Sequence, residues 1–435
     1  MSEDSLHKIV RRKIQKGVIW FWVCILSVCL LMSGCQLSGT KNGVIHLTMW
    51  HALNPPPNRD VFQKLVDKFN QKHPDVQVES LYIGQADQIM PKILTAVIGN
   101  ASPDILWYDS SITGRLVELQ AIQPLEDWLD RSTLKSEIDP ALFEGMVLDG
   151  HTWSIPFSTN NTGIFYRPSL FKAAGITKLP QTWEELRSVA RQLTLDKNGD
   201  GRKDQYGIVL PLGKGEWTVF TWLPFMFSAG GELVEANQPK LINQGAIAAL
   251  DFWSNLIKDG SAIKSLPERG YEQDDFIAGR VAMQVTGPWT LGFLAPMGID
   301  FDVLPIPKNR RQAAVVGGEN LFVMKTTPAR QQAALQFLEY VLSEEFQTEI
   351  ALGTGYLPVN LKSRQSQAYQ NFLTKQPLLQ VFLAQMNQAR SRPNISGYNR
   401  ISDSLGRAIE ATLLGESPQK ALQKAQERLK LFWED

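Results

Sequence analysis

The feature that most constrains the fold is the alternation of strand-like and helix-like segments after residue 43. Residues 44–50, 76–81 and 104–108 are apolar-rich runs typical of strands. Between them, residues 61–69 repeat apolar side chains at helical spacing, and a second helix is expected over about 86–98. Further along the chain, Thr182 with Glu185 three residues later predicts a capping box at the start of another helix. Strands that alternate with helices predict a parallel sheet with crossover helices. In such sheets, ligands bind at the carboxyl ends of the strands.

Aromatic and polar side chains follow each of these strands. Trp50 and His51 end the first strand, Gln85 follows the second, and Asp109 follows the third. Aromatic rings cover apolar ligand faces, and carboxylates and amides bond hydroxyl groups. These residues are therefore candidate ligand contacts. Because Asp109 precedes two serines, it could instead cap a helix.

The N-terminus is typical of a secretory signal. Basic residues precede an uncharged apolar run over 18–32, and Ser33, Gly34 and Cys35 follow it. The run is shorter than the roughly 20 residues of a membrane-spanning helix. We expect cleavage before Cys35, and the alternative is an uncleaved membrane anchor. In both cases the rest of the chain faces away from the cytoplasm.

Cleavage before Cys35 would leave a single cysteine, so we expect no disulfide. The hydrophobic core alone must then stabilise the fold of about 400 residues, a length that usually forms two domains. The full chain has 44 basic and 44 acidic residues, and the part beyond the signal has 39 and 42. A nucleic-acid partner would need a concentrated basic face, which this balance does not favour.

Short motifs stand in a fixed order along the chain. After Leu47–Ala52 (LTMWHA) come Ser102–Ile105 (SPDI), 154–166, 180–186 (PQTWEEL), 278–289 and 353–359 (GTGYLPV). Together they resemble the family 1 extracellular solute-binding proteins of sugar ABC transporters, of the maltose-binding type. In addition, Leu31–Cys35 (LMSGC) resembles the lipobox of bacterial lipoproteins, in which the cysteine is lipidated. Met32 stands where leucine is usual.

The resemblance implies an α/β fold of the two-lobed periplasmic-binding-protein type (type II), with discontinuous lobes joined by hinge crossovers. We expect a signal peptide over 1–34 and a tether over 35–43. The N-lobe would comprise 44–158 and 308–357, and the C-lobe 159–307 and 358–435. The ligand would bind in the cleft and contact both lobes, because only a difference in affinity between open and closed forms can drive closure.

Further candidate ligand contacts lie at the crossovers and in the second lobe. Some have structural alternatives, since the asparagines could satisfy the hinge backbone and a helical tryptophan often belongs to the core. The candidates are Asn160, Asn161, Trp217, Trp222, Trp289, Gly318, Glu319, Tyr356, Tyr398 and Arg400.

The choice between a sugar and a phosphorylated ligand depends on the C-terminal region. The glycerol-3-phosphate-binding branch of the family resembles this chain closely, but it uses an arginine in an RLGN stretch. Here the corresponding stretch is 394–397 (NISG), and only Arg392 or Arg400 could substitute. Burying a phosphate dianion without such partners is costly. We therefore predict a neutral mono- or disaccharide or a glycosylated polyol, with glycerol-3-phosphate or a glycerophosphodiester as the alternative.

Residues 196–204 resemble the start of a calcium loop. Asp196, Asn198, Asp200 and Asp204 occupy ligand positions, and Arg202 would supply a carbonyl. Gly207 replaces the usual bidentate glutamate, which excludes a complete EF-hand. Because similar loops in the family bind calcium, a structural Ca²⁺ is one interpretation of this loop. The alternative is a solvated turn.

A secreted glycoside hydrolase is the rival class, since it would also line a sugar cleft with carboxylates. The chain contains no nucleophile elbow, HExxH motif or P-loop. We therefore expect a monomeric binding protein rather than an enzyme, with no required cofactor. Its partners would be a sugar and the permease subunits in the membrane, and a lipid on Cys35 would anchor it outside the cytoplasm, in the periplasm.

Overall fold

The computed structural model describes residues 43–433, except 55, 86–88, 214, 237, 266–270 and 396. The chain divides into two compact units, Met1–Ile45 and His46–Asp435, and the fold below belongs to the second. The predicted signal peptide, Cys35 and nearly all of the tether lie outside the described residues. Within the described part, no helix has the length and apolar character needed to cross a membrane.

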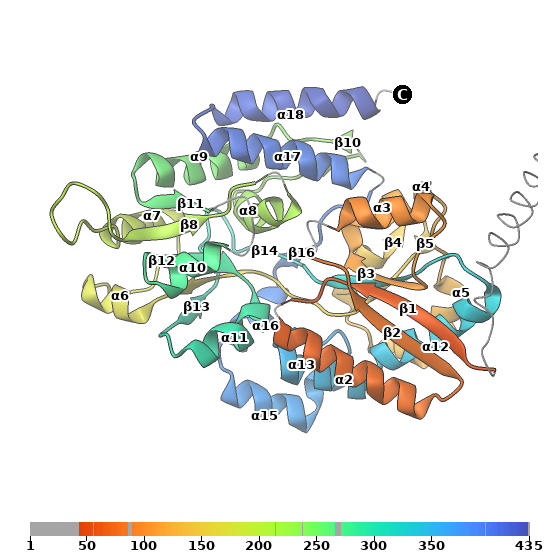
Figure 1. Cartoon of the computed structure of the whole chain (residues 1–435). Coiled ribbons are helices and arrows are strands. Elements are labelled where there is room, and N and C mark those ends of the chain that lie inside the picture. Colours follow the sequence, from red (N-terminus) through yellow and green to blue (C-terminus); the bar gives the residue numbers. More distant parts are fainter. Residues whose placement is uncertain are drawn as a thin grey trace, which may run out of the picture. The chain divides into compact units, whose positions relative to one another are not determined.

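The first sheet has the strand order β2-β1-β3-β15-β6. Its strands are β1 (Ile45–His51), β2 (Val76–Tyr82), β3 (Ile105–Asp109), β6 (Ile155–Pro156) and β15 (Glu319–Val323). Helices α2 (Pro56–Lys72) and α3 (Met90–Ile98) lie on opposite faces of this sheet, as the alternating pattern predicts (Figure 1). Two later helices, α12 (Pro328–Leu342) and α13 (Glu344–Thr354), also belong to this half of the unit. α12 packs against β15, and α13 packs against α2.

The predicted parallel arrangement is confirmed for β1 and β3, whereas one strand of this sheet, β15, runs against its neighbours. β1 runs parallel to β3, with Met49 opposite Ile105. β15 runs antiparallel to both β3 and β6, and Glu319 lies opposite Asp109. The physical reason is that β15 returns from the other lobe instead of following a local crossover helix.

The second sheet has the order β11-β8-β12-β7-β13. Its strands are β7 (Gly163–Tyr166), β8 (Tyr206–Leu210), β11 (Ala262–Lys264), β12 (Val281–Thr286) and β13 (Asp302–Leu304). α8 (Glu216–Ser228), α9 (Gln244–Lys258), α17 (Tyr398–Leu413) and α18 (Pro418–Trp433) pack against one another in this half of the unit (Figure 1). A buried cluster that includes Phe165, Val209 and Phe382 forms its core.

The chain passes through the whole second sheet before it adds β15 to the first, so the first lobe is discontinuous. This arrangement confirms the predicted two-lobed α/β fold. The predicted boundary at 158/159 falls between β6 and β7, and the one at 307/308 falls between β13 and β14 (Ala314–Val315). The boundaries themselves stay predictions.

Local sequence signals explain several element ends. Thr182 and Glu185 form the predicted capping box of α7 (Trp183–Gln192), with reciprocal hydrogen bonds of 3.2 and 3.1 Å. In the SPDI motif, the buried Asp104 accepts the Thr48 N–H at 2.7 Å and pairs with Arg330 of α12. Asp104 therefore joins two strands and a helix of the first lobe.

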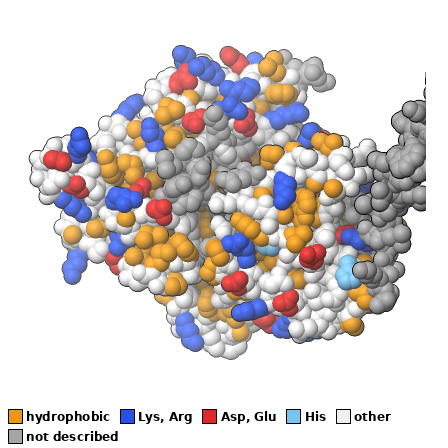
Figure 2. Space-filling model, in the orientation of Figure 1, with side chains coloured by type: hydrophobic (Ala, Val, Ile, Leu, Met, Phe, Trp, Pro, Cys, Tyr) orange, Lys and Arg blue, Asp and Glu red, His pale blue; other side chains and the backbone are white. Residues whose placement is uncertain are grey.

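Charged side chains are spread over the surface rather than gathered. Figure 2 shows basic and acidic side chains interspersed over the visible face. Such mixing is typical of a solvated surface and offers no single-sign field on that face.

Candidate ligand-binding cleft

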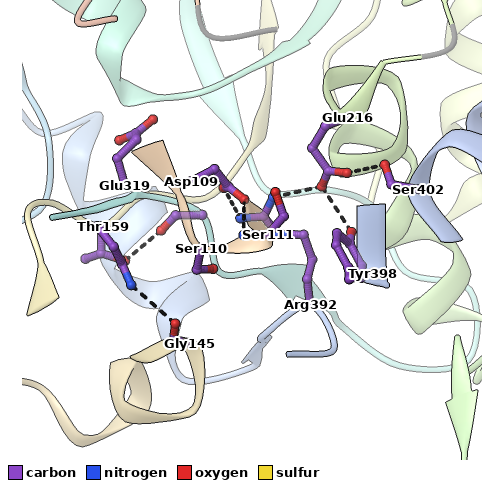
Figure 3. A network of polar contacts seen from close by, with 12 residues as sticks. Asp109, Ser110, Ser111, Gly145, Thr159, Glu216, Glu319, Arg392, Tyr398 and Ser402 are labelled. Carbon is purple, nitrogen blue, oxygen red and sulfur yellow. Dashed lines mark hydrogen bonds and ion pairs between the residues drawn. The ribbon is translucent and has the colours of Figure 1, made fainter. Parts of the chain in front are cut away.

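The two lobes meet where the carboxyl end of β3 faces the first turn of α8. Asp109 ends β3 and caps η1 (Ser110–Ile112), because its carboxylate accepts the Ser111 N–H at 2.9 Å. Directly opposite on β15 stands Glu319, whose Oε2 accepts the Ser158 hydroxyl at 3.2 Å. Directly opposite residues of an antiparallel pair share one face of the sheet. The backbones of Asp109 and Glu319 therefore lie side by side at this end of the sheet, and Figure 3 shows the Glu319 side chain turned away from Arg392.

An arginine from a distant segment joins the two lobes (Figure 3). Arg392 pairs through one Nη atom with Asp109 and through the other with Glu216 Oε1, the latter at 2.8 Å. Glu216 is the first residue of α8, and it also accepts the hydroxyls of Tyr398 (3.0 Å) and Ser402 from α17. The Arg392 side chain is only 8% exposed. These residues form the Arg392 network.

Burial sets the electrostatics of this network. Burial raises the pKa of Glu216, although the charge of Arg392 opposes the rise and that of Asp109 adds to it. Burial by itself would lower the pKa of Arg392. The negative charges of Asp109 and, to a smaller extent, Glu216 outweigh this effect, so the pKa of Arg392 lies above its ordinary value. Burial and the Glu216 charge raise the pKa of Tyr398. Arg392 therefore stays charged, and its charge is matched by two carboxylates.

Aromatic rings adjoin the network on the α8 side. The Arg392 guanidinium lies 5.1 Å from the centre of the Phe220 ring, and Phe220 packs beside Trp217. Trp217 meets Trp289 of η4 (Pro288–Thr290) edge to face, with ring centres 5.8 Å apart. Gly287 has no side chain where the Trp289 indole folds back over it. Trp217 and Trp289 therefore form one aromatic wall with Phe220.

The crossovers between lobes are bridged to one another. Asn160 pairs with Gly317, and Thr159 pairs with Leu357. Gly318 adopts a φ of +125°, and a Cβ there would overlap the Ser158 carbonyl, so only glycine fits this approach. These paired segments form the hinge on which the lobes can move.

The space at this junction is small in the present conformation. A cavity of about 30 Å³ lies at the side of Arg392. Its walls include Ser110, Gly145, Ser158, Gly317 and Asn320. A single water needs roughly 10–15 Å³, and ligand pockets measure roughly 300 Å³ or more. This cavity therefore suits water rather than a sugar ring.

The structure brings some predicted contacts together and separates others. The Arg392 network includes Asp109 and Tyr398. The aromatic wall beside it includes Trp217 and Trp289, and Glu319 lies opposite Asp109 on β15. Gly318 and Asn160 lie in the hinge beside them, and Tyr356 is buried next to the 357 bridge.

Three predicted contacts have other surroundings. The Asn161 amide donates to the Phe382 carbonyl at 2.9 Å and accepts from Gln385 at 2.9 Å, so it joins the hinge to α16 (Leu379–Met386). Trp222 is fully buried within α8, which makes it a core residue. Arg400 lies over the ring of Phe432 at 4.6 Å, at the end of α18.

The remaining candidates lie at the carboxyl ends of β1 and β2 in the first sheet. Trp50 is half-buried, with Lys92 5.5 Å from its ring centre. His51 is 4% exposed and packs against Phe62 and Tyr82. Gln85 is half-buried in the loop after β2.

The calcium-like loop is shaped by its own hydrogen bonds. Asp196 accepts the N–H groups of Gly199 and Gly201 at 2.7 and 2.8 Å, and Asp200 accepts that of Arg202 at 2.8 Å. Asn198 and Asp204 likewise accept backbone N–H groups. Across the described residues, no three histidine, cysteine or acidic side chains are grouped to hold a metal. The loop is thus rich in oxygen atoms that could bind a metal, but these atoms are not grouped around one point. Calcium binding stays a proposal.

Two residues of the network were not among the predicted contacts. Glu216 stands between Gly215 and Trp217 at a helix start, where an acidic residue usually only complements the helix dipole. The second is Ser402 of α17, whose hydroxyl donates to Glu216. Arg392 was considered as a phosphate partner, whereas the structure pairs it with two carboxylates.

Comparisons with known proteins agree with this geometry. The family described as "Bacterial extracellular solute-binding protein" matches residues 64–376. The maltotriose-binding protein of Pyrococcus abyssi is 24% identical over 72% of this chain and 66% of its own length, a little under two thirds. The sn-glycerol-3-phosphate-binding periplasmic protein UgpB of Shigella flexneri is 24% identical over 92% and 94%. The cyclic alpha-maltosyl-1,6-maltose binding protein of Arthrobacter globiformis superimposes with a TM-score of 0.75 and 26% identity, over 89% and 99%.

Proposed function

Because this chain belongs to the bacterial extracellular solute-binding proteins, we propose that it is the substrate-binding component of an ABC uptake transporter for a neutral sugar. The ligand would be a mono- or disaccharide or a glycosylated polyol. The similarity to maltotriose- and maltosyl-maltose-binding proteins supports this class. The lobes would close on the ligand, and the permease would receive it from the closed form.

The two ion pairs of Arg392 are the observation that favours a neutral ligand over a phosphorylated one. Its charge is already matched by Asp109 and Glu216, and Glu319 adds a further carboxylate nearby. A phosphate dianion brought here would meet more negative than positive charge. Hydroxyl groups fit better, because a carboxylate offers about four acceptor sites and Asp109 uses two. The wall of Trp217 and Trp289 would cover the apolar faces of the sugar.

A glycerol-3-phosphate or glycerophosphodiester ligand is the second candidate, because UgpB is similar over 92% of this chain. Two features oppose it. Arg400 lies over Phe432, away from the network. Asn394, where that branch has its arginine, donates to the Val147 carbonyl.

A binding role accounts for the carboxylates better than hydrolysis does. A glycosidase needs one carboxyl group free to donate a proton and a second one free to attack or activate water. Asp109 and Glu216 share one guanidinium instead. Incubation with candidate disaccharides should therefore leave them intact.

Lipidation of Cys35 would keep this protein close to its permease on the outer side of the membrane. Mass spectrometry of the mature N-terminus should find a diacylglyceryl cysteine, and Cys35→Ser should release or mislocalise the protein. An unmodified residue 35 in the wild type would remove the lipid anchor from the proposal.

A thermal-shift panel tests the ligand class, because a ligand that binds only the folded form raises the melting temperature. The panel compares maltose, maltotriose and tagatose with glycerol-3-phosphate and glycerophosphocholine. Calorimetry then measures affinity for each compound that shifts melting. We expect a neutral sugar to bind and the phosphates to bind at least a hundredfold more weakly. Tight binding of a phosphate without any sugar binding would contradict the proposal.

A further inference from the structure

Arg392 connects residues that belong to different lobes. It lies two residues beyond the end of β16 (Ala389–Arg390), which pairs with β14 near the hinge. Asp109 ends a strand of the first sheet, and Glu216 begins α8, which packs on α9 and α17 of the second lobe. When the lobes separate, the distance between these two carboxylates must grow. A single guanidinium could then keep only one of them.

The neighbouring Arg390 offers a natural contrast. It makes a two-pronged ion pair with Glu232, at 2.8 and 2.6 Å, and lies 4.4 Å from the ring centre of Phe227. Phe227 belongs to α8, and Glu232 follows it in the same lobe. Both arginines of this short segment are ion-paired and lie over a phenylalanine of α8, but only the contacts of the more buried Arg392 cross from lobe to lobe.

The closed junction leaves little space beside Arg392. The cavity of about 30 Å³ cannot hold a sugar ring. Room for a ligand at this point requires its walls to move apart. Because Ser110 lines this cavity and follows Asp109 directly, the wall that moves carries Asp109 with it. Separation of the lobes to admit a ligand therefore breaks at least one of the two ion pairs.

We propose that Arg392 is a latch that holds the two lobes closed when no ligand is bound, and that the ligand must break one of its two ion pairs to bind. Arg392 thereby competes with the ligand for the closed arrangement. The latch weakens binding and slows access to the cleft. Its strength sets the fraction of ligand-free protein that is open.

Replacing Arg392→Met tests this directly, since methionine keeps the apolar contact with Phe220 and removes the charge. Without a spanning cation, Asp109 and Glu216 repel each other, and the ligand-free lobes should open. Arg390→Met is the matched control, because its ion pair lies within one lobe. Glu216→Gln is a second variant that removes one arm of the latch while retaining a side chain that can bond Tyr398 and Ser402.

Hydrogen–deuterium exchange of the full chain, without ligand, reports opening. Amide exchange in peptides that cover η1 and the first turn of α8 should be about tenfold faster in Arg392→Met and faster in Glu216→Gln. Arg390→Met should match the wild type. Exchange in the core strands β3 and β12 should stay slow in all variants, which shows that they are folded. Equal exchange in Arg392→Met and the wild type, or equal acceleration by Arg390→Met, would overturn the latch.

Calorimetry with maltotriose gives a second readout, which alone rests on the proposed sugar-binding function. Arg392→Met should bind maltotriose about tenfold more tightly than the wild type. Weaker binding would mean that Arg392 contacts the sugar, and would overturn the latch. If neither protein binds maltotriose, that sugar is excluded as a ligand, while the exchange experiment still decides the latch.

Discussion

Acidification should destabilise this protein through the imidazole of His51. The ring is 4% exposed and packs against Phe62 and Tyr82. Its Nδ1 accepts the Leu53 N–H at 3.3 Å. A proton on Nδ1 would abolish this hydrogen bond, because two N–H donors would then face each other. Burial, with the nearby charge of Arg59, lowers the pKa of His51 from 6.5 to about 4.

The sign of the effect follows from which state binds the proton first. As the pH falls below 6.5, the unfolded chain protonates His51 while the folded protein does not until about pH 4. The free energy of unfolding therefore falls across this window and is fully retained above it. The gap between the two pKa values corresponds to about 3 kcal/mol, at about 1.4 kcal/mol per pKa unit.

Urea unfolding of the wild type and His51→Gln at several pH values between 7.5 and 4 measures this effect. His51→Gln should be the less stable protein at neutral pH, and the difference should shrink by about 1.4 kcal/mol per pH unit below 6.5. His46→Gln is the matched control, because His46 is an exposed residue of the same strand. A difference between wild type and His51→Gln that stays constant from pH 7 to 4.5 would refute the reasoning.

Four further predictions concern other parts of the molecule. Asp104→Asn should cost about 3 kcal/mol in urea unfolding, because it leaves Arg330 without its charged partner in a buried pair; a loss below 1 kcal/mol would contradict this. Thr182→Ala should cost about 1 kcal/mol by removing the capping box, and Thr182→Ser should restore most of it. Trp289→Ala should weaken maltotriose binding about tenfold or more in calorimetry while the far-UV circular dichroism stays unchanged. Calcium should raise the melting temperature by a few degrees, EGTA should reverse this, and Asp200→Asn should abolish the response; identical melting with calcium and EGTA would remove the calcium proposal.

The sequence predicted the elements whose causes are local. Apolar spacing located α2, and the capping box located the start of α7. The motif order predicted the discontinuous lobes, because it matched a known family rather than any local rule. The antiparallel β15 was missed, since a strand that returns after more than 150 residues leaves no periodic signal.

Candidate residues at strand ends could be found because their position follows from the topology. Asp109 and Glu319 are such residues. The pairing of Glu216 with Arg392 could not be predicted, because 176 residues separate them and each looks ordinary in its own segment. The amide of Asn161 shows the same limit, since its partners on α16 are more than 220 residues away.

Two carboxylates at the lobe junction explain why a buried arginine stands between them. Asp109 and Glu216 are both acidic, and the charge of Asp109 helps to raise the pKa of Glu216. Without a cation between them, they would repel each other at a buried site, which is costly. Arg392 offsets this repulsion by pairing with both, and the same two contacts join the lobes. The residue that makes two acidic side chains tolerable at this junction is therefore also the one whose ion pairs must change when the lobes separate.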